Sequence, residues 1–239
     1  MYKNKRSECV LCGAFGHEIT KEHHPTKSLI INKIYNNYLV MPTCKHCNNS
    51  LSFNEEVLVD LIEYYKYHYF NEKINNKILH SIDRNKKIKC IIDDFFENNQ
   101  RLRVKTELLY PVLIKYSKIH NYICHEYYND KATYSIINMK FIDEMSRDDI
   151  NKFFSPVSIE YDNEERQIDY FDTMIENENK INYLASNYYF TKDGVYKTFN
   201  KMIPGEYEFI LFPDADIENA MHFKLNLKNI IFCEILIKN

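Results

Sequence analysis

The stretch CKHCNNSLSFNEE, residues 44–56, decides how this chain begins to fold. It opens with a Cys-x-x-Cys pair, Cys44 and Cys47, and runs at once into a segment of helical character. A second pair with the same spacing, Cys9 and Cys12, lies near the start of the chain. Thiolates suit Zn²⁺, and a two-residue gap lets both sulfurs of a pair turn toward one ion. The four cysteines therefore predict a structural zinc site, which would supply much of the folding energy of a small N-terminal module.

The total cysteine content supports a metal site over a disulfide framework. There are seven cysteines, an odd number, and four of them form the two tight pairs. The other three, Cys90, Cys124 and Cys233, lie in apolar or helical contexts and are interpreted as core residues. The alternative is that the paired cysteines are unligated and that their spacing is accidental.

The hydrophobic pattern argues against a membrane or secreted protein. No apolar run approaches the roughly 18 residues that a membrane span needs. The basic start, MYKNKRSEC, leads into no apolar segment, so a signal peptide is not expected. We therefore expect a soluble, cytoplasmic protein.

Charge is unevenly distributed along the chain, whose net charge is −3. Residues 1–50 hold seven Lys and Arg against three acidic residues, whereas the remainder holds 24 against 31. Four thiolates around one Zn²⁺ would subtract two charges from the first region and leave it mildly basic. Charge alone therefore does not predict a nucleic-acid surface.

Composition and periodicity predict an α+β fold in three parts. Residues 1–55 would form the zinc-binding module, 56–130 a helical region and 131–239 a predominantly β region of unassigned role. The last region is rich in β-branched and aromatic residues. Its segment 223–228 alternates apolar with polar side chains, which is typical of an antiparallel sheet with one covered face.

The helical region is expected to begin near Ser52, where Ser52 and Glu55 have the spacing of a capping box. An apolar stripe then follows at helical intervals: Val57, Leu58, Leu61, Ile62, Tyr65 and Tyr69. Further helices are expected at about 74–82, 87–98 and 111–128.

Between the two cysteine pairs lies KEHHP, residues 21–25, which places an acid beside two histidines. On a regular strand Glu22 and His23 would point to opposite faces, so a bend or the following proline must help if both serve one site. One interpretation makes His23 and His24 exposed polar residues or additional zinc ligands. The other brings Glu22 and His23 together with Asn48 to bind Mg²⁺ or Mn²⁺ and activate a water molecule.

These motifs, CVLCG…TKEHHPTKSL…NNYLVMPTCKHCNNSLSFNEE, resemble the zinc-containing branch of the HNH endonucleases, which have the ββα-metal fold. The resemblance covers about a fifth of the chain. It implies His23 as the general base, Glu22 as the adjacent cation-binding acid and Asn48 as a further ligand of the catalytic cation. The middle asparagine falls on Asn37, with Asn36 as the alternative. The four paired cysteines correspond to the structural zinc ligands.

The resemblance implies a metal-dependent endonuclease that hydrolyses phosphodiester bonds in DNA. The sequence does not distinguish a DNA substrate from an RNA substrate. Members of this family in bacteria often serve in defence against phage, so we expect a protein partner, such as an ATPase, or a second copy of the chain. His24 is the second candidate for the base, and His46 is interpreted as a surface residue or phosphate contact. The alternative function is a zinc-stabilised module whose cleavage site has decayed and which binds nucleic acid or protein without turnover.

Overall fold

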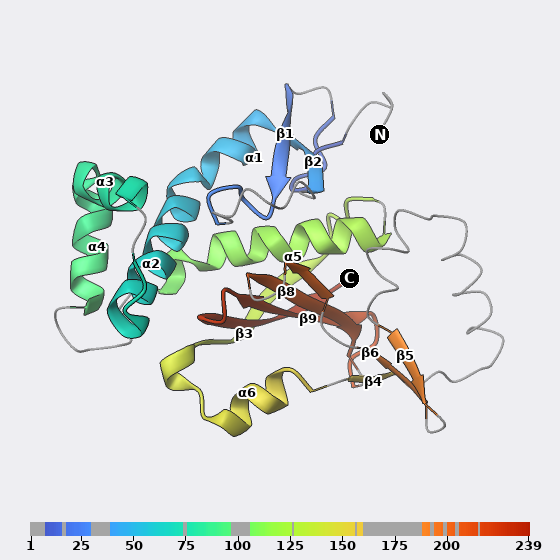
Figure 1. Cartoon of the computed structure of the whole chain (residues 1–239). Helices are drawn as coiled ribbons and strands as arrows, with labels where there is room; N and C mark the ends of the chain where they lie inside the picture. The colour runs from blue at the N-terminus through green and yellow to red at the C-terminus, as the bar shows by residue number, and fades with distance from the viewer. Residues whose placement is uncertain are drawn as a thin grey trace. The chain divides into compact units, whose positions relative to one another are not determined.

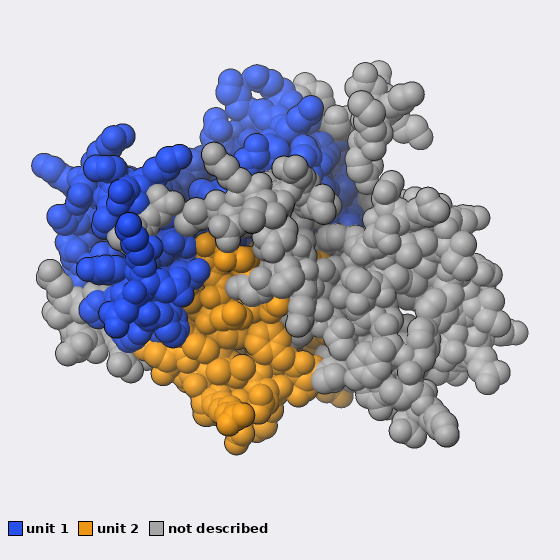
Figure 2. Space-filling view, in the orientation of Figure 1, with its two compact units in different colours: residues 1–136, 239 blue, residues 137–238 orange. Residues whose placement is uncertain are grey.

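The computed structural model confirms the α+β class (Figure 1). The residues that it describes are 8–15, 18–29, 39–73, 76–96, 106–125, 127–155, 157–159, 188–191, 194–197, 200–203, 206–214 and 216–239. The chain divides into two compact units, residues 1–136 with residue 239, and residues 137–238 (Figure 2). No helix within the described ranges is long and apolar enough to cross a membrane.

The first unit starts with a β-hairpin that leads directly into a helix. Strands β1 (Ile19–His24) and β2 (Leu39–Cys44) pair antiparallel, with Ile19 opposite Cys44 and His24 opposite Leu39. Helix α1 (Lys45–Ser50) follows β2 without a connecting loop, since Cys44 is both the last residue of β2 and the N-cap of α1. The N-terminal part is therefore β–β–α in order.

Longer helices complete the first unit close to the ranges expected from periodicity. The predicted stripe on α2 is buried from Val57 to Tyr65, and Tyr69 is half-buried. Helix α5 carries Pro111 in its first turn, as expected. The helices are α2 (Ser52–Phe70), α3 (Asn76–Arg84), α4 (Lys86–Phe96), the short 3₁₀ helix η1 (Thr106–Leu108) and α5 (Tyr110–His125).

The predicted capping box at the start of α2 is wrong, although the helix does begin at Ser52. Leu51 is the N-cap, and a leucine side chain has no atom that can accept a hydrogen bond. Ser52 Oγ instead donates to the Asn49 carbonyl oxygen at 2.9 Å. Glu55 Oε1 accepts a hydrogen bond from Lys115 Nζ at 2.7 Å. The Glu55 carboxylate, which a capping box would use to accept from the backbone, instead forms a tertiary ion pair with Lys115.

Among the described residues that follow α5, most lie in antiparallel sheets (Figure 1). In the larger sheet the strand order is β3–β10–β9–β8–β7, and the bounds are β3 (Thr133–Phe141), β7 (Asn200–Ile203), β8 (Tyr207–Pro213), β9 (Ala220–Leu227) and β10 (Ile231–Lys238). A smaller sheet has the order β4–β6–β5, with β4 (Val157–Ile159), β5 (Tyr188–Thr191) and β6 (Gly194–Lys197). The helical turns between β3 and β4 are η2 (Ile142–Glu144) and α6 (Arg147–Phe153).

Strand β9 shows the expected alternation, with one difference. Its apolar side chains at 223, 225 and 227 are fully buried. On the other side Asn226 is also fully buried, because its amide donates to Glu208 Oε2 and to Asn229 Oδ1, each at 2.8 Å. The polar side of this strand is therefore covered and internally hydrogen-bonded.

The three unpaired cysteines divide in their burial. Cys233 is buried in β10, as predicted for a core residue, and the side chain of Cys124 lies outside the described residues. Cys90 is exposed, so its interpretation as a core residue is wrong. The buried side of α4 carries Ile88 and Ile92, and Cys90 lies two positions from each, which places it on the opposite side of the helix.

Candidate functional site

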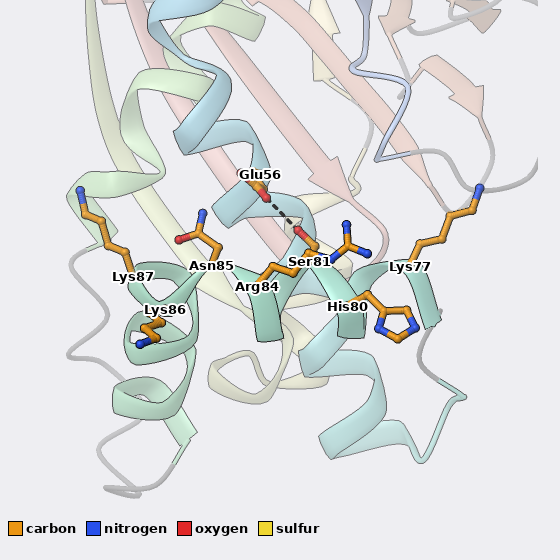
Figure 3. Close-up of a pocket in the computed structure, with 8 residues that line it drawn as sticks. All are labelled: Glu56, Lys77, His80, Ser81, Arg84, Asn85, Lys86 and Lys87. Atoms are coloured by element: carbon orange, nitrogen blue, oxygen red, sulfur yellow. Dashed lines mark hydrogen bonds between the residues drawn. The ribbon is translucent and has the colours of Figure 1, made fainter.

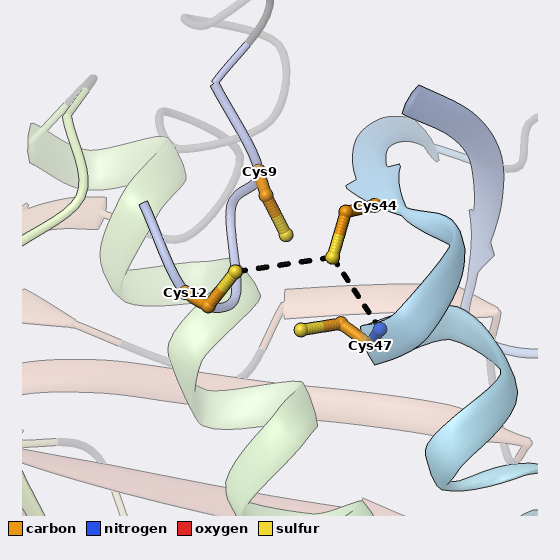
Figure 4. Close-up of side chains that lie close together, drawn as sticks. All are labelled: Cys9, Cys12, Cys44 and Cys47. Atoms are coloured by element: carbon orange, nitrogen blue, oxygen red, sulfur yellow. Dashed lines mark hydrogen bonds between the residues drawn. The ribbon is translucent and has the colours of Figure 1, made fainter. Parts of the chain in front are cut away.

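The four paired cysteines converge on one point, as the sequence predicted (Figure 4). Their sulfur atoms all lie within 4.8 Å of one another, and Cys12 Sγ is 3.9 Å from Cys44 Sγ. A regular tetrahedron of sulfurs around Zn²⁺, with Zn–S near 2.3 Å, has edges of about 3.8 Å. The cluster is therefore compatible with a structural zinc ion.

Backbone geometry fixes the first cysteine pair in place. Gly13 N donates to the Cys9 carbonyl oxygen at 2.8 Å, which closes a tight turn around the pair. Gly13 has φ +69°, a left-handed conformation that favours glycine. A Cβ atom at this position would come within 2.4 Å of the Tyr128 ring. The turn therefore needs glycine both for its conformation and for its close approach to an aromatic side chain.

Helix α5 packs against the cysteine cluster. Ile119 is fully buried in a small core with Val10 and Met41, alongside the two buried cysteines Cys9 and Cys44. Tyr122 and Ile123 pack against the same core. The cluster thus rests on a helix that lies far from it in sequence.

The electrostatics of the four sulfurs favour a bound cation. The Cys47 backbone N–H donates to Cys44 Sγ at 3.4 Å and lowers the pKa of the Cys44 thiol. Burial raises the pKa of Cys12 and of Cys47. Neighbouring thiols add to the rise at Cys47, whereas at Cys12 the effect of Cys9 raises the pKa and the hydrogen bond with Cys47 lowers it. Four thiolates cannot share this volume without a counter-charge, and a divalent cation supplies it.

The hairpin presents one side of β1 to the helices of the same unit. Thr20, Glu22 and His24 alternate with more exposed residues, so their side chains share this side. Asn48 Nδ2, on α1, donates to Thr20 Oγ1 at 3.0 Å. Asn48 therefore lies on the same side of β1 as Glu22, two residues along the strand from it.

Glu22 is the first member of a buried ion-pair network. Lys115 Nζ on α5 donates to Glu22 Oε1 at 2.9 Å and to Glu55 Oε1 at 2.7 Å. The exposed fractions of these side chains are 1% for Lys115, 7% for Glu22 and 12% for Glu55. Burial raises the pKa of Glu55, while the Lys115 ammonium opposes that rise. One cation thus holds two carboxylates that are shielded from water.

A pair of histidines continues this network at the end of β1. His24 Nε2 lies 3.0 Å from His120 Nε2, so one ring nitrogen donates and the other accepts. The His24 ring also meets the Tyr116 ring edge-on, with centroids 5.0 Å apart. Burial, with a contribution from Lys115, lowers the pKa of His24 to about 3, and burial lowers the pKa of His120 as well. Both rings are therefore neutral at physiological pH.

His23 points away from this network, on the other side of β1, and is half-buried. Burial lowers its pKa, and the nearby Lys27 lowers it further. A neutral imidazole can accept a proton, so this environment suits a general base. His46 is exposed, and Asn36 and Asn37 lie outside the described residues.

The candidate residues are thus partly brought together. Asn48 and Glu22 share one side of β1, whereas His23 occupies the other, and the bend that would join His23 to Glu22 does not occur within β1. Sequence reasoning missed Lys115 and His120, which contact β1 from α5. No local sequence motif predicts them, because their partners on β1 lie more than 90 residues earlier in the chain.

Comparison of the chain with family models, with curated proteins and with solved structures finds no match. What can be inferred about function therefore depends on the residues and their geometry.

Proposed function

We propose that this protein is a metal-dependent endonuclease of the HNH type that hydrolyses phosphodiester bonds in DNA. The observation that carries the proposal is the order of elements around the thiolate cluster. A cysteine turn is followed by a hairpin bearing the Glu22–His23 pair, and the second cysteine pair then starts a helix bearing Asn48. The resemblance in sequence required this β–β–α order with the cysteines at both ends.

In the proposed reaction His23 takes a proton from a water molecule, and the resulting hydroxide attacks phosphorus. The bond from phosphorus to the leaving oxygen breaks, and that oxygen acquires a proton from solvent. Glu22 and Asn48 would hold Mg²⁺ or Mn²⁺, which when bound stabilises charge on the phosphate and on the leaving oxygen. Asn37 would orient His23. The lowered pKa of His23 supports its role, because the base must be unprotonated at the start of the reaction.

The buried lysine sets a condition on this proposal. Lys115 Nζ already contacts Glu22 Oε1, so a divalent cation at Glu22 must compete with an ammonium group or share the carboxylate with it. The contact between Asn48 and Thr20 favours a shared site, since it brings the second proposed ligand to the same side of the strand.

Plasmid cleavage with Mg²⁺ or Mn²⁺ tests the proposal, with wild type compared against His23→Ala at matched zinc content. We expect His23→Ala to reduce the cleavage rate by at least about 100-fold, which is the usual contribution of a general base. His68→Ala is the control, because it removes an exposed histidine of α2 to which no role in the site is assigned. Equal cleavage by wild type and His23→Ala would contradict the role of His23.

A second candidate function is favoured by the network around Glu22. A carboxylate that is 7% exposed and paired with a lysine is typical of a structural group, as expected for a binding module whose cleavage site has decayed. Mn²⁺ binding to the zinc-loaded protein, followed by electron paramagnetic resonance, separates the two functions. If wild type binds Mn²⁺ at millimolar concentration and Asn48→Ala does not, the result favours the nuclease. Absence of binding in both favours the decayed module.

The proposal extends to partners. The sequence after residue 50 holds 24 basic against 31 acidic residues, so that region as a whole carries a net negative charge and does not attract nucleic acid at long range. We therefore propose that a protein partner, such as an ATPase, or a second copy of the chain directs it to its substrate. The same assay with an RNA substrate separates DNA from RNA as the target.

A further inference from the structure

A hollow lies beside helices α3 and α4, and its lining is strongly basic (Figure 3). Its volume is about 760 Å³. Of the described residues that line it, one is acidic, Glu56, and its carboxylate accepts a hydrogen bond from Ser81 Oγ at 2.7 Å. The basic side chains of the lining are Lys77, His80, Arg84, Lys86 and Lys87.

The basic side chains form a row rather than a single point. Lys77, His80 and Arg84 are spaced three and four residues apart, so they lie along one side of α3. The opposite side of that helix carries Ile78 and Ile82, which are buried. Seven residues of helix extend about 10 Å, which is about the axial length of three phosphates along one strand of a duplex. Lys77 and Lys87 lie at the two ends of the row (Figure 3).

Two lysines at the start of α4 continue the row of basic residues, although positive side chains at this end do not stabilise a helix. Asn85 Oδ1 accepts from Ile88 N at 3.3 Å, which fixes the turn between the two helices. Lys86 and Lys87 then occupy the first turn of α4, which contains no acidic residue. The helix macrodipole disfavours positive side chains at this end. Lys87 Nζ lies 4.4 Å from the centre of the Phe53 ring, which orients it.

We propose that this hollow binds the phosphate backbone of a nucleic acid. The proposal takes its ligand from the proposed function, but it concerns a surface made of other residues. A row of basic side chains along the hollow fits a linear polyanion, whereas a compact anion would need converging donors. Because phosphate contacts carry no base information, the hollow would position the substrate without selecting its sequence.

The test measures binding rather than cleavage, with no Mg²⁺ or Mn²⁺ present. Fluorescence anisotropy of a labelled DNA duplex is followed over a series of NaCl concentrations for wild type and for Arg84→Gln/Lys86→Gln. The slope of log K against log[salt] is negative, and loss of two phosphate contacts should reduce its magnitude by about 1.8. The affinity should fall by about ten-fold or more. The loss should be equal for two duplexes of unrelated sequence.

Two control variants make the result specific. Lys131→Gln/Lys238→Gln removes the same charge from exposed positions that do not line the hollow and should leave most of the affinity intact. Arg84→Lys/Lys86→Arg keeps the charge and should bind as wild type does. Circular dichroism and zinc content confirm that all variants are folded.

Three outcomes would overturn the proposal: no salt-dependent binding by wild type, equal losses in the two charge-removing variants, or preferential binding of polyglutamate in the hollow. The nuclease proposal fails separately. If wild type binds duplex through the hollow and never cuts it, the hollow stands and the nuclease does not. If wild type cuts and Arg84→Gln/Lys86→Gln binds as well as wild type, the hollow alone is wrong.

Discussion

The two ends of the β1–β2 hairpin are stabilised by different interactions, a cysteine cluster at one end and buried polar contacts at the other. At the end where Ile19 faces Cys44, four sulfurs form a cluster compatible with zinc. Toward the end where His24 faces Leu39, a buried lysine joins two carboxylates and two histidines meet ring to ring. The four sulfurs of the first end come from residues 9–47, with α5 packed against them, whereas the second end takes its polar partners from α2 and α5. Stabilisation by a metal and stabilisation by buried charge should therefore respond to different perturbations.

The thiolate end should show the largest effect when it is broken. Cys44→Ser removes one of four ligands and one of the buried members of the cluster core, so we expect loss of zinc and unfolding of the N-terminal hairpin. Zinc content by mass spectrometry and amide hydrogen exchange of the hairpin provide the readout. Cys90→Ser, at an exposed cysteine of α4, should leave both unchanged. Full zinc content and normal protection in Cys44→Ser would show that this end does not need the metal.

The buried-charge end should show the next largest effect. Lys115→Met leaves the carboxylates of Glu22 and Glu55 buried without their cation, which should cost about 3–5 kcal/mol of unfolding free energy. The loss should be smaller at pH 5 than at pH 7, since the raised pKa of Glu55 lets it take up a proton. Urea denaturation at both pH values measures the difference.

Two further variants control this prediction. Lys118→Met alters a neighbouring lysine of α5 that is not part of the network. Lys118 is half-buried with its Nζ 5.5 Å from the centre of the Tyr134 ring, so we expect a loss of only about 1 kcal/mol or less. The triple variant Glu22→Gln/Glu55→Gln/Lys115→Met removes all three charges with little change in shape and should recover most of the lost stability. Unchanged stability in Lys115→Met alone would show that the network contributes nothing.

The smallest expected effect concerns the histidine pair and pH. Because the pKa of folded His24 is about 3 and the ordinary value is 6.5, the unfolded chain binds the proton more readily as pH falls. This contribution to stability is fully present above pH 6.5 and is lost toward pH 3, by about 2 kcal/mol between pH 7 and pH 5.

His24→Gln sharpens this prediction, because glutamine keeps an amide nitrogen that can donate to His120 and cannot take up a proton. The fall in stability between pH 7 and pH 5, measured by urea denaturation, should be smaller in this variant. His46→Gln, at an exposed position, should retain the wild-type pH dependence. A wild-type pH dependence in His24→Gln would mean that His24 is not the group responsible.

The two ends of the hairpin also differ in how far sequence could predict them. The cysteine cluster follows from a local spacing whose chemistry has one dominant solution, so its four members could be named in advance. Lys115 could not, because a single lysine in a helical segment is normally solvent-exposed, and burial depends on which tertiary partners it meets. Glu55 was likewise not predictable: its spacing from Ser52 indicated a local helix cap, whereas in the structure it pairs with the distant Lys115. The apolar stripe of α2 was predictable from its periodicity. Val59, Asp60 and Glu63 between its members are buried as well, so the helix is covered on more than the predicted side.

The distance in sequence between Glu22 and Lys115 also determines how long after Glu22 its buried partner is synthesised. Lys115 follows Glu22 by 93 residues, an interval of about 5–20 s at ordinary rates of translation. All four cysteines have been added long before that interval ends, so the nascent hairpin can capture zinc while the carboxylate of Glu22 still lacks its cation. On the ribosome the four thiols of the zinc-compatible cluster are thus all in place before the lysine that pairs with Glu22 has been added.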